Sequence, residues 1–485
     1  MLPWLAYAAA ALFYLCAPWL DPTQSNFSVD SWSYQELAHS FGGDTPYEPV
    51  LLRSFWSLEH SAAFPPGYPW LLHLLQTVFG TAPSVAVWFC VCIALLTPLI
   101  AARLARTLGV ATEAGLLAGV ALLGFARYFE EVLSARAIPL AVAAVLGGLV
   151  LLLEARTAWR AVAGGALLGF ACLVRFDQLP LMLLILGYAW WRGTRPREVA
   201  LAALAALAAM SPWMVMSWHY FGTLWASDNS WVAMSSVPVN VTQFPAVSPG
   251  TMFSDPLGFA GKCLRNVVRL VYYGLRLGIP ACPHVAVLLL LWAWHAWRER
   301  TGSALRRHAS LLLISFAALA PQVLTGYPDP RYLCLQLLLV CMLCLGDLYS
   351  APRRPLRIGY PLLGVLAVSL ALLFDARWAA GTVRVSGEVA ATHELDQVLL
   401  LSLKRCQDAE PQVRYVFPHF LTTHAALYAA KLGGRASLTP NGFEQLDAAT
   451  RREFEIAVGP LRYVRPVAVD GTVHTCDELL TERRE

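Results

Sequence analysis

Apolar runs separated by short polar or basic segments dominate residues 1–375 of the chain. A helix needs about 20 residues to cross the hydrocarbon core of a bilayer, and by that criterion we predict about eleven membrane helices. The first is retained, because residues 1–20 lack the basic start and small-residue cleavage site of a signal peptide. The predicted helices begin near Trp4, Ser84, Ala111, Ala137, Ala161, Gln178, Leu201, Pro283, Ser310, Tyr332 and Ile358.

Two further segments are predicted to lie on the membrane surface. The stretch 68–80 is short for a span, and it stands between Pro-Pro-Gly-Tyr-Pro and Gly-Thr-Ala-Pro. Apolar residues interleave with Lys262, Arg265, Arg269 and Arg276, and this spacing describes an amphipathic helix. For these cations, attraction to anionic lipid is favoured over a role with substrate.

The loops between the apolar runs alternate in charge. Purely basic loops are cytoplasmic by the positive-inside rule, whereas the longer loops of mixed charge face outward. The alternation places the N-terminus in the cytoplasm, provided that 68–80 does not cross the membrane. The basic loops contain Arg103 and Arg106; Arg156 and Arg160; Arg192, Arg195 and Arg197; Arg298, Arg300, Arg306 and Arg307; and Arg353, Arg354 and Arg357.

The composition changes after residue 375, where charged residues rise and short mixed patterns appear. We therefore predict an all-α polytopic membrane bundle over residues 1–375, including a first outer loop at 21–83. A small extracytoplasmic α/β domain follows over 376–485, with a strand at Arg414–Phe417 and a helix around Phe454. Cys406 and Cys476 lie in that domain, and whether they form a disulfide stays open.

Composition supports this division and limits the classes of function. Hydrophobic residues make up 57% of the chain and charged residues 14%, a charged fraction below that of soluble domains. The net charge is only +4, and the basic residues cluster between apolar runs. The charge pattern is therefore typical of membrane topology, and it gives no indication of nucleic-acid binding.

The first outer loop carries the most informative chemistry. Asp30 stands at the start of an amphipathic helical pattern, where the simplest role of its carboxylate is to cap the helix. The alternative is a general base that takes a proton from an attacking acceptor at the membrane surface. The same loop contains Arg53 and His60, and Tyr68 follows in Pro-Pro-Gly-Tyr-Pro, which alone predicts a rigid turn with an aromatic belt residue.

Other outer loops place charged residues at the mouth of the bundle. Glu130 and Glu131 can form a solvated loop or part of a site, because ionisable groups at this depth are costly. Arg175 and Asp177 can form a local ion pair or line a charged cavity. The segment Pro-Asp-Pro-Arg331-Tyr332 opens a later helix, where the Arg331 guanidinium can snorkel to lipid or hold a phosphate. Arg136 ends the second outer loop.

Motifs for metal or nucleotide chemistry are absent from the sequence. The chain has no His-Glu-x-x-His, no Asp-x-Asp and no paired Cys-x-x-Cys set outside the apolar runs. It also has no Gly-rich phosphate loop, which argues against nucleotide hydrolysis. We therefore assign no metal ligands, and the need for a divalent cation as cofactor stays open.

The order of these motifs resembles a known family. An Asp30 loop after one helix, then Phe-Pro-Pro-Gly-Tyr-Pro, then Leu-Val-Arg175-Phe-Asp177 and finally Pro-Arg331-Tyr332 resembles the GT-C glycosyltransferases. The branch it is similar to contains bacterial protein O-mannosyltransferases and the aminoarabinose transferase of lipid A. The resemblance covers residues 1–375. It implies a multi-pass protein of the inner (plasma) membrane that transfers sugar from a polyprenyl-phosphate donor to an extracytoplasmic lipid, glycan or protein.

The resemblance also implies roles for individual residues. Asp30 would be the catalytic base, and Arg331 would contact the donor phosphate with help from Arg53 or Arg136. Family members often place an acidic residue just before the fourth helix; here Ala-Arg136 stands there and Glu131 lies earlier as the second catalytic candidate. The remaining substrate-binding candidates are His60, Tyr68, Glu130, Arg175, Asp177 and Tyr332.

Two other classes of function compete with the enzyme. A transporter or flippase of a lipid-linked saccharide would carry charges deep within its spans and helices broken at mid-membrane. The charges here cluster at helix ends, which favours the enzyme. A scaffold that binds cell-envelope partners would give Asp30, Arg175 and Arg331 no reason to converge.

Overall fold

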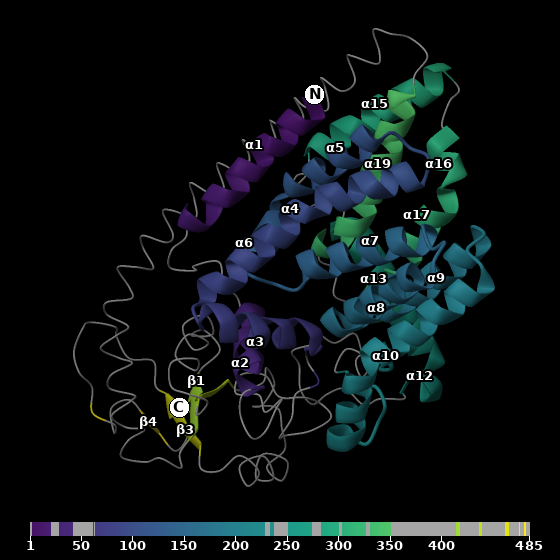
Figure 1. Ribbon diagram of the computed structural model, residues 1–485. Helices are drawn as coiled ribbons and strands as arrows, with labels where there is room; N and C mark the ends of the chain where they lie inside the picture. Colours follow the sequence, from purple (N-terminus) through teal and green to yellow (C-terminus); the bar gives the residue numbers. More distant parts are fainter. Residues whose placement is uncertain are drawn as a thin grey trace.

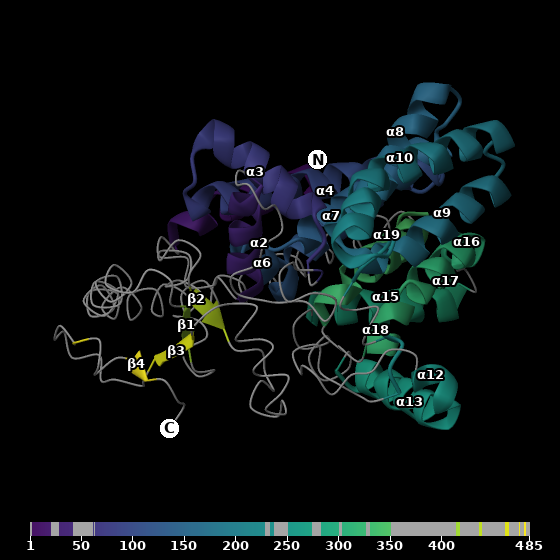
Figure 2. The same cartoon turned by 90° about the horizontal axis from the view of Figure 1, so that it is seen from below.

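A computed structural model describes most of the predicted membrane part and a few short segments beyond it. The described residues are 2–20, 29–41, 62, 64–227, 233–236, 251–273, 283–299, 303–325, 330–350, 414–417, 436–438, 461–464, 475 and 480–481. Helices form a layered bundle, and a small sheet lies beside its α2–α3 end in both Figure 1 and Figure 2.

Ten of the predicted apolar runs coincide with helices, and the run near Ile358 lies outside the described residues. The apolar runs fold as helices because neither lipid nor a packed core offers water to unpaired backbone groups. These helices are α1 (Leu2–Cys16), α4 (Pro83–Thr107), α5 (Thr112–Leu123), α7 (Ile138–Leu153), α8 (Ala158–Val174), α9 (Leu179–Trp191), α10 (Pro196–Phe221), α15 (Pro283–Glu299), α17 (Ala309–Ala317) with α18 (Ala320–Thr325), and α19 (Cys334–Tyr349).

Fewer of these helices reach membrane-spanning length than the apolar runs predicted. Within the described residues, four are long and apolar enough to cross a bilayer: Leu2–Trp19, Pro83–Thr107, Pro196–Phe221 and Arg331–Tyr349. A fifth span results if α6 (Ala126–Leu133) and α7, which meet at a bend of 108°, count as one. The other apolar helices are shorter, because turns such as the one at Gly124 end them early. The number eleven therefore stays a prediction.

Small residues hold the central helices together. Helix α8 packs between α7 and α10. A Cβ atom on Gly165 would come within 2.0 Å of the carbonyl oxygen of Ala202, and one on Gly169 within 2.4 Å of that of Ala206. Helices that must pack in lipid use such small residues, because only close backbone approach gives them enough contact.

Short elements gather at one end of the long helices, where α2 (Val29–Ser40) and α3 (Gly67–Phe79) lie against each other (Figure 1). The predicted surface helix at 68–80 is thus a helix of 13 residues. The same end contains α6, the 3-10 turn η2 (Phe176–Gln178) and the 3-10 turn η4 (Pro330–Leu333). The 3-10 turn η1 (Ala17–Leu20) follows α1.

The predicted amphipathic helix forms, but one of its cations does not face lipid. Helix α13 (Pro256–Tyr273) follows α12 (Thr251–Ser254), and α16 (Ser303–Arg307) lies farther along the chain. Lys262 is buried, and its ammonium donates to the carbonyl oxygens of Ala233 and Ser235. Its predicted attraction to lipid is therefore wrong, whereas Arg265 and Arg269 are exposed. Arg276 lies outside the described residues.

Four short strands form a sheet in the C-terminal part. They are β1 (Arg414–Phe417), β2 (Ala436–Leu438), β3 (Leu461–Val464) and β4 (Leu480–Thr481), in the order β2-β1-β3-β4. Strand β1 pairs parallel with β2 and β3, and β3 pairs antiparallel with β4. The predicted strand at Arg414–Phe417 is confirmed. The helix expected around Phe454 and the Cys406–Cys476 pair lie outside the described residues.

Candidate active site

Asp30 lies in the first turn of α2 and is half exposed. A carboxylate is favourable there, because the helix N-terminus carries partial positive charge. Its Oδ2 atom is 3.7 Å from Nη1 of Arg331, which belongs to η4. The other carboxylate partner of Arg331 is Glu131, which lies 200 residues away in the sequence. Asp30 is thus part of an ion network between elements that are distant in the sequence.

Glu131 is the buried centre of that network. Its Oε1 atom accepts from Nη1 of Arg136 at 2.6 Å and from Nη1 of Arg331 at 3.2 Å, and the carboxylate is only 2% exposed. Glu131 and Arg136 are brought together by the sharp turn between α6 and α7. In this turn the backbone N–H of Arg136 donates to the Glu131 carbonyl oxygen. Ala135 adopts a left-handed backbone conformation (φ 50°) within the turn.

Tyr68 fixes this turn from α3. Its ring is fully buried, and its hydroxyl donates to the Ala135 carbonyl oxygen at 2.7 Å. The ring also packs edge-on against Tyr34 of α2, with centroids 4.9 Å apart. Tyr68 therefore positions the residues before Arg136, and its side chain does not line the cavity described below.

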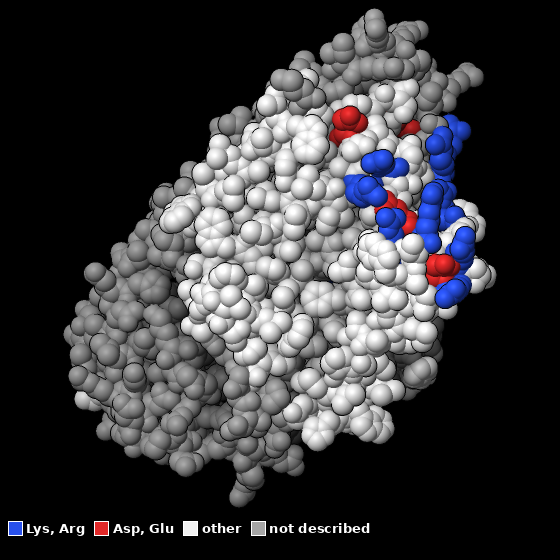
Figure 3. Space-filling view, viewed as in Figure 1, with Lys and Arg blue, Asp and Glu red and all other residues white. Residues whose placement is uncertain are grey.

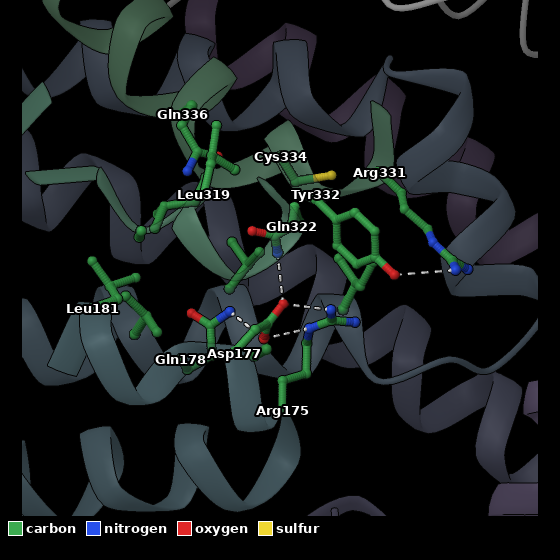
Figure 4. Close-up of a pocket in the computed structure, with 16 residues that line it drawn as sticks. Arg175, Asp177, Gln178, Leu181, Leu319, Gln322, Arg331, Tyr332, Cys334 and Gln336 are labelled. Carbon is green, nitrogen blue, oxygen red and sulfur yellow. Dashed lines mark hydrogen bonds and ion pairs between the residues drawn. The ribbon is translucent and has the colours of Figure 1, made fainter. Parts of the chain in front are cut away.

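A second ion pair lies beside the first network. Arg175 donates from Nε and Nη2 to the two carboxylate oxygens of Asp177, at 3.0 and 2.6 Å. The amides of Gln178 and Gln322 donate to the same carboxylate at 2.9 and 2.8 Å (Figure 4). Burial favours the neutral acid, but Arg175 outweighs it, so the pKa of Asp177 lies below its ordinary value. In turn, Asp177 outweighs the effect of burial on Arg175 and raises its pKa.

Tyr332 joins the two clusters. The guanidinium carbons of Arg175 and Arg331 lie 4.7 and 5.2 Å from the centroid of its ring. Nη2 of Arg331 also donates to the Tyr332 hydroxyl at 3.3 Å, as Figure 4 shows. Nearby, burial and the charge of Asp30 raise the pKa of Tyr34 well above its ordinary value. Arg175, Arg331 and Tyr332 thus share one polar site, and the neutral phenol of Tyr34 lies beside it.

This polar site forms one side of a small cavity of about 40 Å³ (Figure 4). Arg175, Asp177, Gln322 and Arg331 line its charged side. Its opposite side is apolar and comes from α7, α9 and α19. The apolar residues include Ile138, Val142, Val145, Leu181, Leu319 and Leu335. The cavity thus has one charged and one apolar side.

The structure brings together most of the predicted site residues. Asp30, Glu131, Arg136, Arg175, Asp177, Arg331 and Tyr332 meet at one end of the bundle. Glu130 instead pairs with Arg127 at 2.7 Å on a more exposed surface and takes no part in the ion network. Arg53 and His60 lie outside the described residues.

The polar residues that hold these charges were not among the predicted site residues. Gln178 adjoins Asp177, and Gln322 is a polar residue within an apolar run. Because a buried polar group in an apolar helix is costly, Gln322 could have been singled out on that ground. Tyr34 was also not predicted to belong to the site, yet it is buried beside the charged residues.

The described carboxylates do not suit a metal ion. No group of three or more His, Cys, Asp or Glu side chains within the described residues is placed to hold one. Glu131 is held by two arginines and Asp30 by one of these, so a divalent cation would displace cations from both. We therefore derive no step through a metal, and the need for a divalent cation stays open.

Comparison with known proteins shows the fold. No family model and no curated protein sequence matches the chain. Apo ArnT from Cupriavidus metallidurans superposes with a TM-score of 0.56 at 14% identity, covering 95% of this chain and 91% of that chain. The chain therefore has the same fold as ArnT. ArnT from the same organism, bound to undecaprenyl phosphate, superposes with a TM-score of 0.55 at 15% identity, covering 94% of this chain and 88% of that chain.

A second GT-C structure supports the same assignment. The apo oligosaccharyltransferase of Archaeoglobus fulgidus superposes with a TM-score of 0.52 at 11% identity, covering 96% of this chain and 69% of that chain. The resemblance predicted from the order of the Asp30, Arg175 and Arg331 motifs is thus confirmed at the level of the fold. Membrane residence agrees with the long apolar helices of this chain.

Proposed function

We propose that this protein is a GT-C glycosyltransferase that moves a sugar from a polyprenyl-phosphate donor to an acceptor outside the cytoplasm. The observation that carries the proposal is the meeting of Asp30, Glu131 and Arg331 beside a cavity with one charged and one apolar side. A carboxylate can serve as base there, and arginines can hold a phosphate. Each of these groups comes from a different element.

The shape of the site supports a lipid-linked donor. The apolar residues on α7, α9 and α19 suit an isoprenoid chain, and Arg175 and Arg331 lie beside them to receive its phosphate. ArnT, which has the same fold, has been solved with undecaprenyl phosphate bound. The identity of the sugar and the acceptor is not part of this proposal.

The reaction follows from these positions. An acceptor O–H or N–H gives its proton to the Asp30 carboxylate as the acceptor atom bonds to the anomeric carbon of the sugar. The bond from that carbon to the phosphate oxygen breaks, and its electron pair leaves with the polyprenyl phosphate. The leaving group is already a stable anion, so it needs neighbouring cations more than a strong acid. Attack opposite the leaving group gives inversion.

Arg331 connects donor binding to the base. In the structure its Nη1 atom is shared between Asp30 at 3.7 Å and Glu131 at 3.2 Å. A bound phosphate would compete for the same N–H groups and leave the Asp30 carboxylate to accept the proton. Glu131 would keep Arg331 and Arg136 in place, because its buried charge must remain paired.

The charge distribution favours this enzyme over a transporter. A transporter of lipid-linked saccharide is expected to carry ionisable groups and broken helices at mid-membrane. The charged residues of the site instead lie at helix ends, with Arg175 after α8, Asp177 before α9 and Arg331 before α19. Charged groups at helix ends suit an acceptor that approaches from water.

The test is to supply the purified, folded protein with a panel of polyprenyl-phosphate sugars and candidate acceptors. We expect one donor to be consumed, with release of polyprenyl phosphate in proportion to glycosylated acceptor. Release of polyprenyl phosphate without glycosylated acceptor would indicate donor hydrolysis. No consumption of any donor, together with movement of a lipid-linked saccharide across a vesicle membrane, would support the transporter and contradict the proposal.

A further inference from the structure

A second hollow lies at the opposite end of the helices that carry the candidate active site. It has a volume of about 280 Å³, and three turns form it: α4–α5, α7–α8 and α9–α10. Helix α8 runs from this hollow to Arg175 and has 17 residues, so the two sites are roughly 25 Å apart along it. Its lining residues are Thr107, Leu108, Leu153, Ala155, Arg156, Arg192, Gly193, Thr194 and Arg195.

The hollow is cationic. Within the described residues, Arg156 and Arg192 have no carboxylate partner, and Arg195 comes only within 4.0 Å of Glu198. The adjacent Glu154 is already held by Arg103 through two hydrogen bonds of 2.6 and 2.7 Å. Figure 3 shows the positive charges gathered around this end, while the rest of the described surface in that view is nearly uncharged. These guanidinium groups are exposed and suit an anion that binds from solvent or from lipid.

The backbone of the hollow is fixed by hydrogen bonds. Helix α9 ends with Gly193 in a left-handed conformation (φ 94°), and the Thr194 N–H donates to the Ala189 carbonyl oxygen at 3.0 Å. The Thr194 hydroxyl donates to the Leu152 carbonyl oxygen at 3.4 Å and ties this turn to α7. Helix N-termini and C-termini both reach this end, so the arginines rather than the dipoles set its charge.

Aromatic side chains place the hollow at a membrane boundary. The span Pro83–Thr107 ends at the hollow, and the span Pro196–Phe221 begins beside it. Trp159, Trp190 and Trp191 are each more than 60% exposed beside it, at 62%, 64% and 66%. Tryptophan gathers at the level of lipid headgroups, and basic residues gather on the cytoplasmic side. An anionic headgroup in that leaflet would be within reach of the hollow.

We propose that this hollow binds a phosphate group, which Arg156, Arg192 and Arg195 hold on the side of the protein opposite to the candidate active site. The position beside exposed tryptophans favours the phosphate of an anionic phospholipid. Free inorganic phosphate has the same chemistry and is the other source. The inference does not depend on the proposed sugar transfer.

The test compares two triple variants by native mass spectrometry. Arg156→Gln/Arg192→Gln/Arg195→Gln removes the charges of the hollow. Arg106→Gln/Arg197→Gln/Arg306→Gln is the control, because it removes the same charge from exposed arginines that do not line the hollow. Each protein is extracted from mixed vesicles of phosphatidylglycerol and phosphatidylcholine, and its thermal midpoint is measured to verify folding.

We expect the wild type and the control to retain phosphatidylglycerol over phosphatidylcholine, and the hollow variant to lose this preference by about tenfold. Titration with inorganic phosphate, followed by ³¹P NMR, identifies the other source. Phosphate binding that the hollow variant loses, without lipid retention, would support a site for soluble phosphate. Equal losses in both triple variants, or no binding of either ligand to the wild type, would overturn the proposal.

Discussion

Arg331 joins the carboxylates of the site to its aromatic residue. Its guanidinium contacts Asp30, Glu131 and the ring of Tyr332 at once. Only a planar, multidentate cation can do this, because a lysine ammonium is a compact point charge. The identity of this residue, and not its charge alone, should therefore matter for the donor.

Arg331→Lys should raise the KM for the polyprenyl-phosphate donor by about tenfold or more, because the fork that matches phosphate is lost. Initial rates over a donor titration measure this. Arg127→Lys is the matched control, since Arg127 pairs with Glu130 away from the ion network. Equal effects of the two substitutions would contradict the role given to Arg331.

Asp177 gives the site a predictable response to acid. Its folded-state pKa lies below its ordinary value of 3.8, so the ionised carboxylate contributes stability at neutral pH. That contribution is complete above the ordinary pKa and is lost as the pH falls through the lower folded value. Asp177→Asn should cost about 3 kcal/mol of stability at neutral pH, because Arg175 loses its buried partner.

The thermal midpoints of wild type and Asp177→Asn, measured in detergent across pH, test this direction of the pH dependence of stability. The gap between them should stay constant from about pH 8 to about pH 5 and narrow only below about pH 4. Narrowing between neutral pH and pH 5 would show that the Asp177 carboxylate is not held in its ionised form.

The sequence identified the charged residues of the site better than it identified their partners. Arg175 and Asp177 were singled out as oppositely charged neighbours in an outer loop, and they do form a buried pair. Gln322 contacts Asp177 from 145 residues away, a distance that local patterns do not reveal. Glu130 and Glu131 are adjacent and alike in sequence, and only the turn of α6 buries one and exposes the other.

At the scale of elements, the close approach of α3 and α8 positions the site. A Cβ atom on Gly67 would lie 2.8 Å from the backbone carbonyl carbon of Leu173, two residues before Arg175. The Pro-Pro-Gly-Tyr-Pro motif, which the sequence indicated only as a rigid turn, thus contains a glycine that the packing of α8 requires. Tyr68 follows it and holds the turn before Arg136.

Gly67→Ala should push α3 away from α8, because the added methyl group meets backbone that cannot yield. We expect a loss of about 1–3 kcal/mol in stability and a fall in transfer activity. Gly187→Ala in α9 is the control, because no atom lies within 4 Å of its added Cβ. Thermal midpoints of the two variants measure the difference. A neutral Gly67→Ala would contradict the close approach.

The order and type of the helices were predictable because lipid leaves the backbone few alternatives to a helix. Their lengths were less predictable. The apolar run near Ala111 gives α5, which ends after 12 residues at Gly124, and the run near Ser310 divides into α17 and α18. Hydrophobicity reports where a chain can be buried, but glycines and turns inside a run decide where each helix ends.

At the scale of the whole molecule, the two ends of the bundle differ in charge. Asp30, Glu131, Arg175 and Arg331 meet at one end. The described arginines of the loops predicted to be cytoplasmic form a basic surface at the other end. This separation agrees with the alternation of loop charge in the sequence. The direction in which the bundle is inserted remains a prediction from the positive-inside rule.

Single cysteines introduced at the two ends test the orientation. A membrane-impermeant maleimide applied to intact cells should label Arg127→Cys, near the candidate active site, above the level of the wild type. Arg197→Cys, at the basic end, should react only after the membrane is permeabilised. The reverse pattern would place the candidate active site in the cytoplasm and contradict an extracytoplasmic acceptor.

The fold was recognisable from the sequence because the order of the Asp30, Arg175 and Arg331 motifs along the chain resembles that of a known family. The volume and lining of the cavity were not predictable, because Gln322, Leu335 and Ile138 reach it from separate helices. The hollow at the basic end was equally hidden, since the sequence shows its arginines only as separate loop clusters.

In the proposed sugar transfer, Asp30 takes the proton of the acceptor. The most direct measurement is the rate of acceptor glycosylation by purified Asp30→Asn protein, with Glu130→Gln as the acidic control outside the ion network. Asp30→Asn should lose transfer by at least about a hundredfold while keeping donor binding and a native thermal midpoint, because an amide cannot accept the proton. Normal transfer by folded Asp30→Asn protein would contradict the account.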